Sequence, residues 1–486
     1  MSKEDISNYF DKYIYLEEET NQLITTYGEK VGVLPIDQNI IKINDSEVNV
    51  LSGATQKDGI YYLPITAMTK VYNVNIEYIK EERILLLDSL DRKLVKADSS
   101  KNCSVKYKAT SFSKTVDSIG KGDKVICIEK LENNWTKVRT KNGYIGYVKT
   151  NILQNEIYVR DNIEKTVRTE KINLVWDYYS EYGTAPDRSG TTIEGVNVVS
   201  PAFFSLISKG NGAINTNIGN SGLNYIKWAK ENNYEIWAMF SNNSYKETTN
   251  QILNSYELRT KVINNIVSLA VKYELDGINL DFENMLTEDK DMYSRFVIEL
   301  KPKLQEAGIT LSVDVTAPDG GSAWSECYDR NVIGDVADYI VFMAYDQYGT
   351  GSKKAGTTAG YNWVENNLKK FIDREEIDSN KIILGIPFYT RLWTEYNGAV
   401  TSKTVNMNSI DTVLPSNITK EWNDELKQYY VEYTQNGKTY KMWIEDEKSI
   451  KNKVSLVRQY NLAGVAAWEK DRETENVWNV IKEELD

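Results

Sequence analysis

Eight short apolar runs decide the expected fold of the larger part of the chain. They read INLVW (172–176), VNVVSPAFF (196–204), EIWAMF (235–240), GINLDFE (277–283), ITLSVDV (309–315), YIVFMAY (339–345), KIILGIPF (381–388) and AGVAAW (463–468). Segments with apolar residues at helical spacing, such as LRTKVINNIVSLAVKYEL, lie between them. Buried parallel strands have nearly continuous apolar sequences and are joined by helices. Eight such units within about 310 residues predict an α/β protein with a closed (β/α)8 barrel rather than an open sheet.

The interval between the seventh and eighth runs is too long for one connecting helix. It contains QYYVEYTQNGKTYKMWIED, in which Asn-Gly separates two alternating segments as in a β-hairpin. We therefore expect a small α+β insertion at about residues 394–460, at the rim of a barrel domain that covers residues 165–486.

Two small domains are expected before the barrel. Residues 1–100 contain short strand-like runs and the segment YYLPITAMTKVYNVNIEYIKEERILLL, which resembles the stalk domain of many clostridial and bacillar surface proteins. A generic α+β cap is an equally good interpretation. Residues 101–155 alternate apolar and polar positions between Asn-Asn and Asn-Gly turns, which is typical of an all-β barrel.

The second of these domains resembles the bacterial Src-homology-3-like barrel. The residues that carry the resemblance are the Trp-x-x-Val run at 135–138 and Gly-Tyr-x-Gly-Tyr-Val at 143–148. Such modules often bind cell-wall peptide or glycan, and a spacer without a ligand is the alternative.

Composition removes several classes of function. The chain has 58 Lys and Arg against 70 Asp and Glu, a net charge of −12, which argues against a nucleic-acid binder. It has no histidine, which excludes Ser-His-Asp and Cys-His catalysis and His-ligated zinc. Acid–base chemistry must therefore use carboxylates, Tyr, Lys or Cys. We expect no cofactor, no metal and a monomer.

The three cysteines and the absence of long apolar stretches bear on location. Cys103, Cys127 and Cys327 form no Cys-x-x-Cys motif, so a metal knuckle is not expected. Cys103 and Cys127 fall in one small domain, and we expect a reduced pair rather than a disulfide.

No apolar stretch is long enough to span a bilayer, and residues 1–30 lack a signal-peptide core. Either an export segment has been removed or the protein reaches its site by another route.

The stretch DGINLDFE at 276–283 carries the candidate chemistry. Because side chains alternate along a strand, Asn279, Asp281 and Glu283 are expected on one face. The carboxyl end of a barrel strand is where such barrels hold their active sites. Two carboxylates at this spacing couple, so one is pushed towards its protonated form, and a neutral Glu beside an ionised Asp suits protonation of a leaving oxygen. A salt-bridged strand end is the non-catalytic alternative.

This stretch resembles the Asp-Gly-x-Asp-x-Asp-x-Glu signature of glycoside hydrolase family 18, the chitinases and related N-acetylglucosaminidases. FMAYD (342–346) is similar to the Met-x-Tyr-Asp of the family, and GIPFYTR (385–391) is similar to its Gly-x-Pro-Phe-Tyr-x-Arg. Trp468 falls where the family has the Trp that forms the floor of the −1 sugar site. The resemblance begins at about residue 171 and reaches the end of the chain.

The resemblance implies a role for each matching residue. Glu283 would protonate the glycosidic oxygen and later act as base on water, while the 2-acetamido carbonyl of the substrate replaces an enzyme nucleophile, with retention of configuration. Asp281 would hold the acetamido N–H, and Tyr345 would orient its oxygen. Asp346 would bind the distorted −1 sugar above Trp468.

Two positions depart from the family pattern. The middle Asp of the motif is Asn279 here, and the usual Trp before the Glu is Phe282. An amide at 279 can hydrogen-bond Asp281 but cannot hold its proton. We therefore expect the titration of Asp281 to be simpler than in the family pattern and the pH range of activity to be narrower. Together with the envelope-type N-terminal region, NLDFEN resembles the spore-cortex and cell-wall glucosaminidase branch more than secreted chitinases.

Further candidates lie where the predicted strands or the insertion meet the groove. They are Asn279, Met343, Tyr389, Arg391, Asn242 and Glu445 as substrate-binding residues, and Trp176 and Asp314 as residues of the groove or of the core. For Trp176, packing inside the barrel is an equally good interpretation. Arg391 could instead pair with a carboxylate and brace the barrel mouth, and Asp314 could instead belong to the core.

Three functions remain open, and the first is preferred. The chain is expected to hydrolyse β-1,4 bonds next to N-acetylglucosamine in peptidoglycan, outside the cell at the wall or spore surface. A chitinase is the enzymatic alternative, which the scattered positions of the Trp residues disfavour. A lectin-like wall protein is the non-enzymatic alternative, which the presence of Glu283 disfavours.

Overall fold

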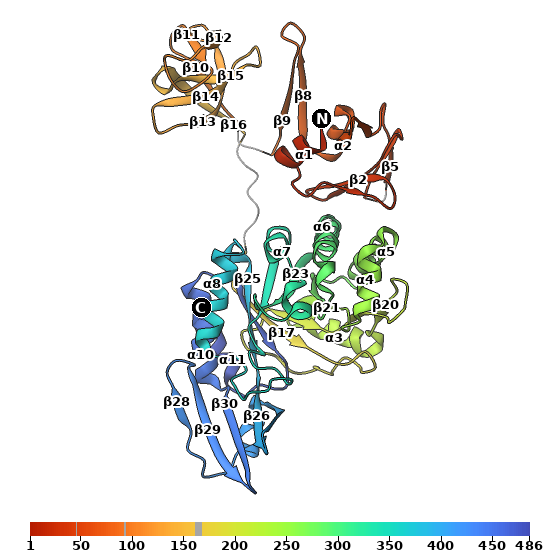
Figure 1. Cartoon of the computed structure of the whole chain (residues 1–486), viewed down its shortest axis with the longest axis vertical. Coiled ribbons are helices and arrows are strands. Elements are labelled where there is room, and N and C mark those ends of the chain that lie inside the picture. The colour runs from red at the N-terminus through yellow and green to blue at the C-terminus, as the bar shows by residue number, and fades with distance from the viewer. Residues whose placement is uncertain (45, 92–93, 161–167) are drawn as a thin grey trace. The chain divides into compact units, whose positions relative to one another are not determined.

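The computed structural model describes residues 1–44, 46–91, 94–160 and 168–486, and the chain divides into two compact units (Figure 1). Most of residues 1–168 form the first unit, and residues 169–486 form the bulk of the second. Within the described residues, no helix is long and apolar enough to cross a membrane.

The second unit is a closed barrel of eight parallel strands, as predicted. Each expected apolar run supplies one strand: β17 (Ile172–Asp177), β18 (Val198–Pro201), β21 (Glu235–Ser241), β22 (Gly277–Asp281), β23 (Thr310–Thr316), β24 (Tyr339–Met343), β25 (Ile382–Pro387) and β31 (Gly464–Trp468). Neighbours in the chain are neighbours in the sheet, and pairing of β17 with β31 and of β18 with β21 closes the ring. The short pair β19 (Phe204–Leu206) and β20 (Ile214–Thr216) extends from β21.

Helices surround the barrel and bury one face each against it (Figure 1). In α8, for example, Val364, Leu368 and Phe371 are buried at a spacing of four and three residues, the stripe that a helix presents to a core. The helices are α3 (Gly219–Glu231), α4 (Lys246–Asn254), α5 (Tyr256–Lys272), α6 (Lys290–Glu306), α7 (Arg330–Val336), α8 (Tyr361–Asp373), α10 (Glu447–Gln459) and α11 (Val477–Leu485).

A separate apolar cluster fills the inside of the barrel. It includes Leu174, Trp176, Trp237 and Met239, which alternate along β17 and β21 with residues that face the helices. Trp176 and Trp237 are 1% exposed, so the barrel has a packed centre and leaves room for a site only at its end.

The insertion is a five-stranded antiparallel sheet with the order β27-β26-β30-β29-β28. The expected hairpin is confirmed, because Asn436 (φ 50°) and Gly437 (φ 72°) form the turn between β29 and β30 with the positive φ pair that a type I′ turn requires. The expected boundaries 394–460 need correction, because β26 already begins at Tyr389 and α10 packs in the barrel core. The elements are β26 (Tyr389–Tyr396), β27 (Ala399–Asn406), α9 (Ile410–Val413), β28 (Glu421–Asn423), β29 (Gln428–Gln435) and β30 (Lys438–Ile444).

Within its described residues, the first unit contains a five-stranded sheet, two β-hairpins, a seven-stranded sheet and two short α-helices. Helix α1 starts with a capping box in which Ser2 and Asp5 satisfy each other's backbone N–H groups. One sheet has the strand order β1-β2-β3-β4-β5, followed by two hairpins, β6–β7 and β8–β9. The elements are α1 (Lys3–Tyr9), β1 (Tyr15–Glu17), β2 (Gln22–Tyr27), β3 (Lys30–Pro35), β4 (Ile40–Ile43), β5 (Ser46–Asn49), β6 (Thr55–Lys57), β7 (Ile60–Tyr62), α2 (Ile65–Val71), β8 (Val74–Ile79) and β9 (Ile84–Ser89).

The other sheet has seven antiparallel strands in the order β12-β11-β15-β14-β13-β10-β16. It includes β10, which precedes residue 101, so this sheet begins earlier than the expected domain boundary. Its likeness to a Src-homology-3 barrel stays a prediction. Cys103 on β11 and Cys127 on β13 are thiols, and burial raises the pKa of Cys127 to about 11. The strands are β10 (Leu94–Ser99), β11 (Cys103–Lys106), β12 (Thr115–Ile119), β13 (Lys124–Lys130), β14 (Trp135–Arg139), β15 (Ile145–Lys149) and β16 (Leu153–Arg160).

Candidate active site

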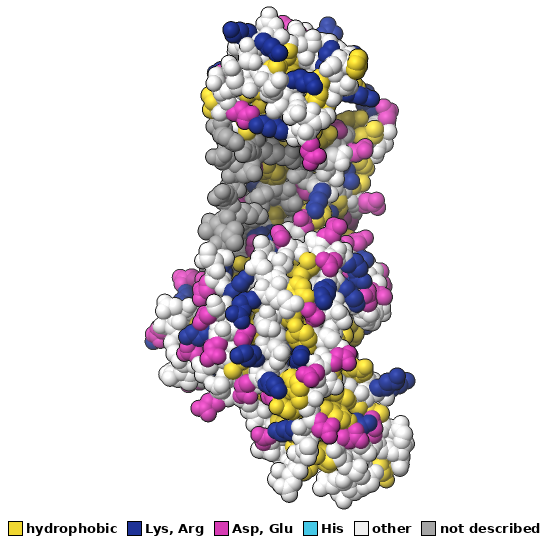
Figure 2. All heavy atoms as spheres, turned by 90° about the vertical axis from the view of Figure 1, so that its left-hand side faces the viewer, with side chains coloured by type: hydrophobic (Ala, Val, Ile, Leu, Met, Phe, Trp, Pro, Cys, Tyr) yellow, Lys and Arg dark blue, Asp and Glu magenta, His cyan; other side chains and the backbone are white. Residues whose placement is uncertain are grey.

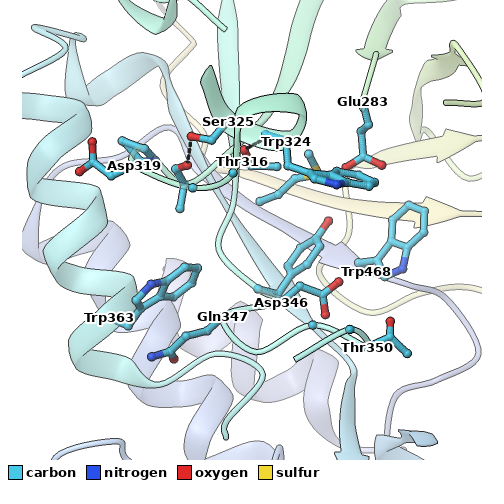
Figure 3. Close-up of a pocket in the computed structure, with 18 of the residues that line it drawn as sticks. Glu283, Thr316, Asp319, Trp324, Ser325, Asp346, Gln347, Thr350, Trp363 and Trp468 are labelled. Carbon is cyan, nitrogen blue, oxygen red and sulfur yellow. Dashed lines mark hydrogen bonds between the residues drawn. The ribbon is translucent and has the colours of Figure 1, made fainter. Parts of the chain in front are cut away.

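A cavity of about 750 Å³ lies at the carboxyl ends of the barrel strands (Figure 3). Residues at or beyond the ends of β22, β23, β24 and β31 line it, together with α8 and the first residue of β26. Figure 3 shows Glu283, Asp346 and Trp468 around one end of this space, and Asp319, Gln347 and Trp363 around the other. The cavity is thus elongated across the barrel mouth.

Glu283 is held at its backbone on both sides. Strand β22 ends at Asp281, and the Glu283 N–H donates to Asn242 Oδ1 (3.0 Å) while Asn242 Nδ2 donates to the Glu283 carbonyl (2.9 Å). The Tyr328 hydroxyl donates to the carbonyl of Phe282 at 2.7 Å. These contacts fix the backbone and leave the Glu283 carboxyl in the cavity, where burial, then the charges of Asp281 and Asp346, raise its pKa to about 8.

Below the cavity, Asn279 joins three other strands across the barrel. Its Oδ1 accepts from Trp176 Nε1 on β17 (2.7 Å) and from Ser200 Oγ on β18 (3.3 Å). Its Nδ2 donates to Asp314 Oδ1 (2.6 Å) and to Ser312 Oγ (3.0 Å), both on β23. The sequence left open a bond from this amide to Asp281, but the four partners named here lie on other strands. Asn279 is fully buried and does not line the cavity.

Asp281 lines the cavity and is 8% exposed. Burial, followed by the charge of Asp314, raises its pKa well above the usual value. The sequence suggested an ionised Asp beside a neutral Glu283. In the structure both carboxyls have raised pKa values, because both are removed from water in a group of like charges.

Asp346 is oriented by two residues that follow β25. Tyr389 Oη and Arg391 Nη2 each donate to Asp346 Oδ1 at 2.8 Å, and Asp346 has a φ of 56° that turns the chain sharply after β24. Arg391 is 5% exposed and does not itself line the cavity, whereas Tyr389 does. Tyr345 lines the cavity beside Asp346, and burial raises its pKa well above the usual value, so its hydroxyl is a donor at neutral pH.

Comparison with known proteins settles the family. Residues 174–473, more than half of the chain, match Glycosyl hydrolases family 18. The chain belongs to this family. Its (β/α)8 barrel is the fold that the motifs predicted.

Relatives of this chain come from Bacillus species and from animals. The glycosylase YdhD of Bacillus subtilis is 31% identical over 46% of this chain and 53% of its own length. The cortical fragment-lytic enzyme of Bacillus subtilis is 24% identical over 49% of this chain and 55% of its own length. Human di-N-acetylchitobiase is 24% identical over 45% of this chain and 66% of its own length. The chain thus spans about half the length of the two bacterial relatives.

Solved structures agree on the fold. The spore cortex-lytic enzyme SleL of Bacillus megaterium superposes with a TM-score of 0.56 at 21% identity, covering 75% of this chain and 89% of that chain. The chitinase of Chromobacterium violaceum gives 0.55 at 21% identity, covering 65% and 99%. At this identity the likeness supports the fold alone.

Three tryptophans line the family-18 cavity, and two of them were not singled out from the sequence. Trp468, the expected one, ends β31, and its ring is 5.6 Å from those of Trp176 and Tyr178. Trp324, which is 47% exposed, lies in a π-helical turn after β23, and Trp363 lies in the first turn of α8. The only available signal was their position after predicted strands five and six.

The remaining candidates divide into two groups. Met343 lines the cavity beside Tyr345. Asn242 does not line it and instead holds the backbone of Glu283. Glu445 does not reach the groove as expected: it is fully buried, and its carboxylate accepts bonds from Gln428, Ser449 and Lys453 (2.6–2.8 Å). The buried ammonium of Lys453 on α10 pairs with the Glu445 carboxylate at 2.8 Å, so Glu445 joins the insertion to the barrel.

The face of the second unit that Figure 2 shows carries Lys and Arg interspersed with Asp and Glu, without one basic patch. Among the described residues, Asp, Glu and Cys side chains form no group of three or more suited to holding a metal ion.

Proposed function

We propose that this family-18 enzyme hydrolyses β-1,4 bonds next to N-acetylglucosamine in peptidoglycan, with retention of configuration and with help from the acetamido group of the substrate. The observation that carries the proposal is the Glu283 carboxyl, which has a pKa of about 8 and lies in the same cavity as Asp281 and Tyr345. A carboxyl that is still protonated at neutral pH is suited to act as a general acid.

In the first step, Glu283 gives its proton to the glycosidic oxygen while the acetamido carbonyl oxygen of the −1 sugar attacks the anomeric carbon. The bond to the leaving sugar breaks, and a cyclic intermediate with a positive charge forms. Asp281 accepts the acetamido N–H and stabilises that charge. The Tyr345 hydroxyl donates to the acetamido oxygen and orients it for attack.

In the second step, the Glu283 carboxylate takes a proton from water, and the water oxygen opens the cyclic intermediate from the opposite face. Two inversions give net retention, and Glu283 regains its proton. Asp346, held by Tyr389 and Arg391, binds the distorted −1 sugar over Trp468. No cofactor or metal takes part in either step.

Peptidoglycan is the preferred polymer because a curated relative is a cortical fragment-lytic enzyme. Action outside the cell, at the wall or spore surface, follows from that choice, with the domain at residues 101–155 as a wall-binding module. We propose that the enzyme works as a monomer.

Chitin is the second candidate, and one observation favours it. The scattered Trp positions argued against chitin, but the fold gathers Trp324, Trp363 and Trp468 around one cavity. Aromatic faces stack on the C–H faces of sugar rings, so the cavity offers three platforms for an N-acetylglucosamine polymer.

The test is digestion of purified vegetative wall, spore cortex and chitin, with mass spectrometry of the products. Reducing-end N-acetylglucosamine from wall or cortex supports the proposal. Reducing-end muramic acid shows a muramidase, and activity on chitin alone overturns the choice of substrate.

The matched variants are Glu283→Gln, which removes the acid, and Glu288→Gln, which makes the same change at an exposed position five residues away. We expect the first to abolish release of new reducing ends while wall binding stays nearly intact, and the second to behave as wild type. Unchanged hydrolysis by Glu283→Gln contradicts the mechanism.

A further inference from the structure

Asp314 is a buried carboxyl to which the mechanism above gives no role. It lies on β23, is 1% exposed and does not line the cavity. Its Oδ1 accepts the Asn279 Nδ2–H bond at 2.6 Å. Removing a carboxyl from water is costly, and one neutral amide does not neutralise its charge.

The barrel register places Asp314 next to Asp281. Strands β22 and β23 are parallel neighbours in which Asn279 pairs with Ser312 and Leu280 with Val313. The next step along both strands brings Asp281 level with Asp314, and side-chain alternation turns both towards the barrel interior.

The groups that face this pair are acidic or phenolic. Glu283 raises the pKa of Asp314, and Asp314 raises that of Asp281, in each case after the larger effect of burial. Tyr293 from α6, Tyr328 from the segment before α7 and Tyr345 after β24 feel the same charges. Among the described residues that line the cavity there is no Lys or Arg. Two ionised carboxylates at this place would therefore lack a compensating cation.

We propose that Asp314 is the partner carboxyl of Asp281, that the two hold one proton between them, and that Asn279 positions Asp314 for this purpose. The proposal rests on the proposed function, in which Asp281 binds the acetamido N–H. When that N–H approaches, the shared proton moves to Asp314 and Asp281 carries the negative charge, so the number of protons in the pair stays the same. The change from Asp to Asn at 279 thus transfers a carboxyl to the neighbouring strand rather than removing it.

The first test is the acidic limb of the pH profile of kcat/KM in three variants. Asp314→Asn keeps the size of the side chain but removes the partner whose shared proton stabilises the charged form of Asp281, so the acidic limb should move to higher pH by about one unit. The double variant Asn279→Asp/Asp314→Asn returns a carboxyl to β22 and should restore the limb. Asp289→Asn is the control, because Asp289 is also buried and bonded by two Asn amides (2.7 Å each) but lies outside the cavity.

A limb that stays in place or moves to lower pH in Asp314→Asn overturns the proposal, as does a double variant that behaves like Asp314→Asn. A purely structural role for Asp314 would change stability without moving the limb.

The second test needs no activity. Because the pKa of Asp314 is raised in the folded state, its stabilising effect is present below the unfolded pKa and is lost as the pH rises. The Tm of Asp314→Asn relative to wild type should therefore increase with pH, and the double variant should reverse this trend. If wild type cleaves none of the polymers, the proposed function fails while this measurement still tests the pair, and a Tm difference independent of pH refutes it.

Discussion

Replacing Glu283 by Gln should stabilise the barrel, and increasingly so as the pH rises. The carboxyl has a pKa of about 8 in the folded protein against 4.5 for the ordinary side chain. Between these values the folded state binds more protons than the unfolded state, so wild-type stability falls as the pH rises through this window. An amide does not titrate and escapes this loss.

The size of the effect follows from the two pKa values. The linkage relation gives the Gln variant an advantage of about 1 kcal/mol at pH 5 and about 3 kcal/mol at pH 7. For a barrel of roughly 300 residues, an advantage of about 3 kcal/mol corresponds to a Tm increase of about 5 °C.

The assay is calorimetry of the barrel transition at pH 5, 6, 7 and 8 for wild type, Glu283→Gln and the exposed control Glu288→Gln. The gap between wild type and Glu283→Gln should widen with pH, and the control should show none. A gap that is constant over this range, or a Glu283→Gln protein less stable than wild type throughout, refutes the argument that burial and like charges keep this carboxyl neutral.

Three further changes test the supports of the site. Asn242→Ala should lower kcat roughly 10- to 100-fold and stability by about 1–3 kcal/mol, because it removes the partner of both backbone groups of Glu283. Steady-state kinetics measure the first effect and denaturant unfolding measures the second. Asn242→Asp should recover only part of the loss. Arg391→Lys should raise KM more than it lowers kcat, because a Lys ammonium cannot keep the geometry of the Arg391 bond to Asp346; equal losses on both would speak against a binding role. Trp363→Ala should reduce kcat/KM about tenfold on polymer and hardly at all on a chromogenic disaccharide, since its ring lies at the far end of the cavity; equal loss on both substrates would place it at the reacting sugar.

The barrel was predictable because a strand buried on both faces has a nearly continuous apolar sequence. Every residue from Gly277 to Asp281 is buried, and the corresponding run is free of charge until Asp281 and Glu283. The site residues on strand ends were predictable for the same reason, since the end of a run marks the barrel mouth. The family motifs then assigned roles that spacing alone does not give.

The residues that were missed lie in segments whose apolar residues have no regular spacing. Trp324 and Trp363 reach the cavity from a loop and from the start of a helix, and their positions depend on closure of the whole barrel. Glu445 was wrongly predicted to reach the groove because its partner Lys453 lies in the helix that follows it. Nothing in the alternation of the preceding strand reveals a buried ion pair. The partners of Asn279 lie on three different strands, which only barrel register brings together.

The amide of Asn242 continues the sheet where β22 has stopped. Its side chain supplies both a donor and an acceptor to the backbone of Glu283, as a backbone residue of a neighbouring strand would. These two bonds fix Glu283 beside the end of β21. The segment that follows has attachments of its own, namely buried Met285 and the bonds from Asn250 and Asn254 on α4 to Asp289. The support of the Glu283 backbone from the end of β21 is therefore separate from the support of the rim segment that comes after it.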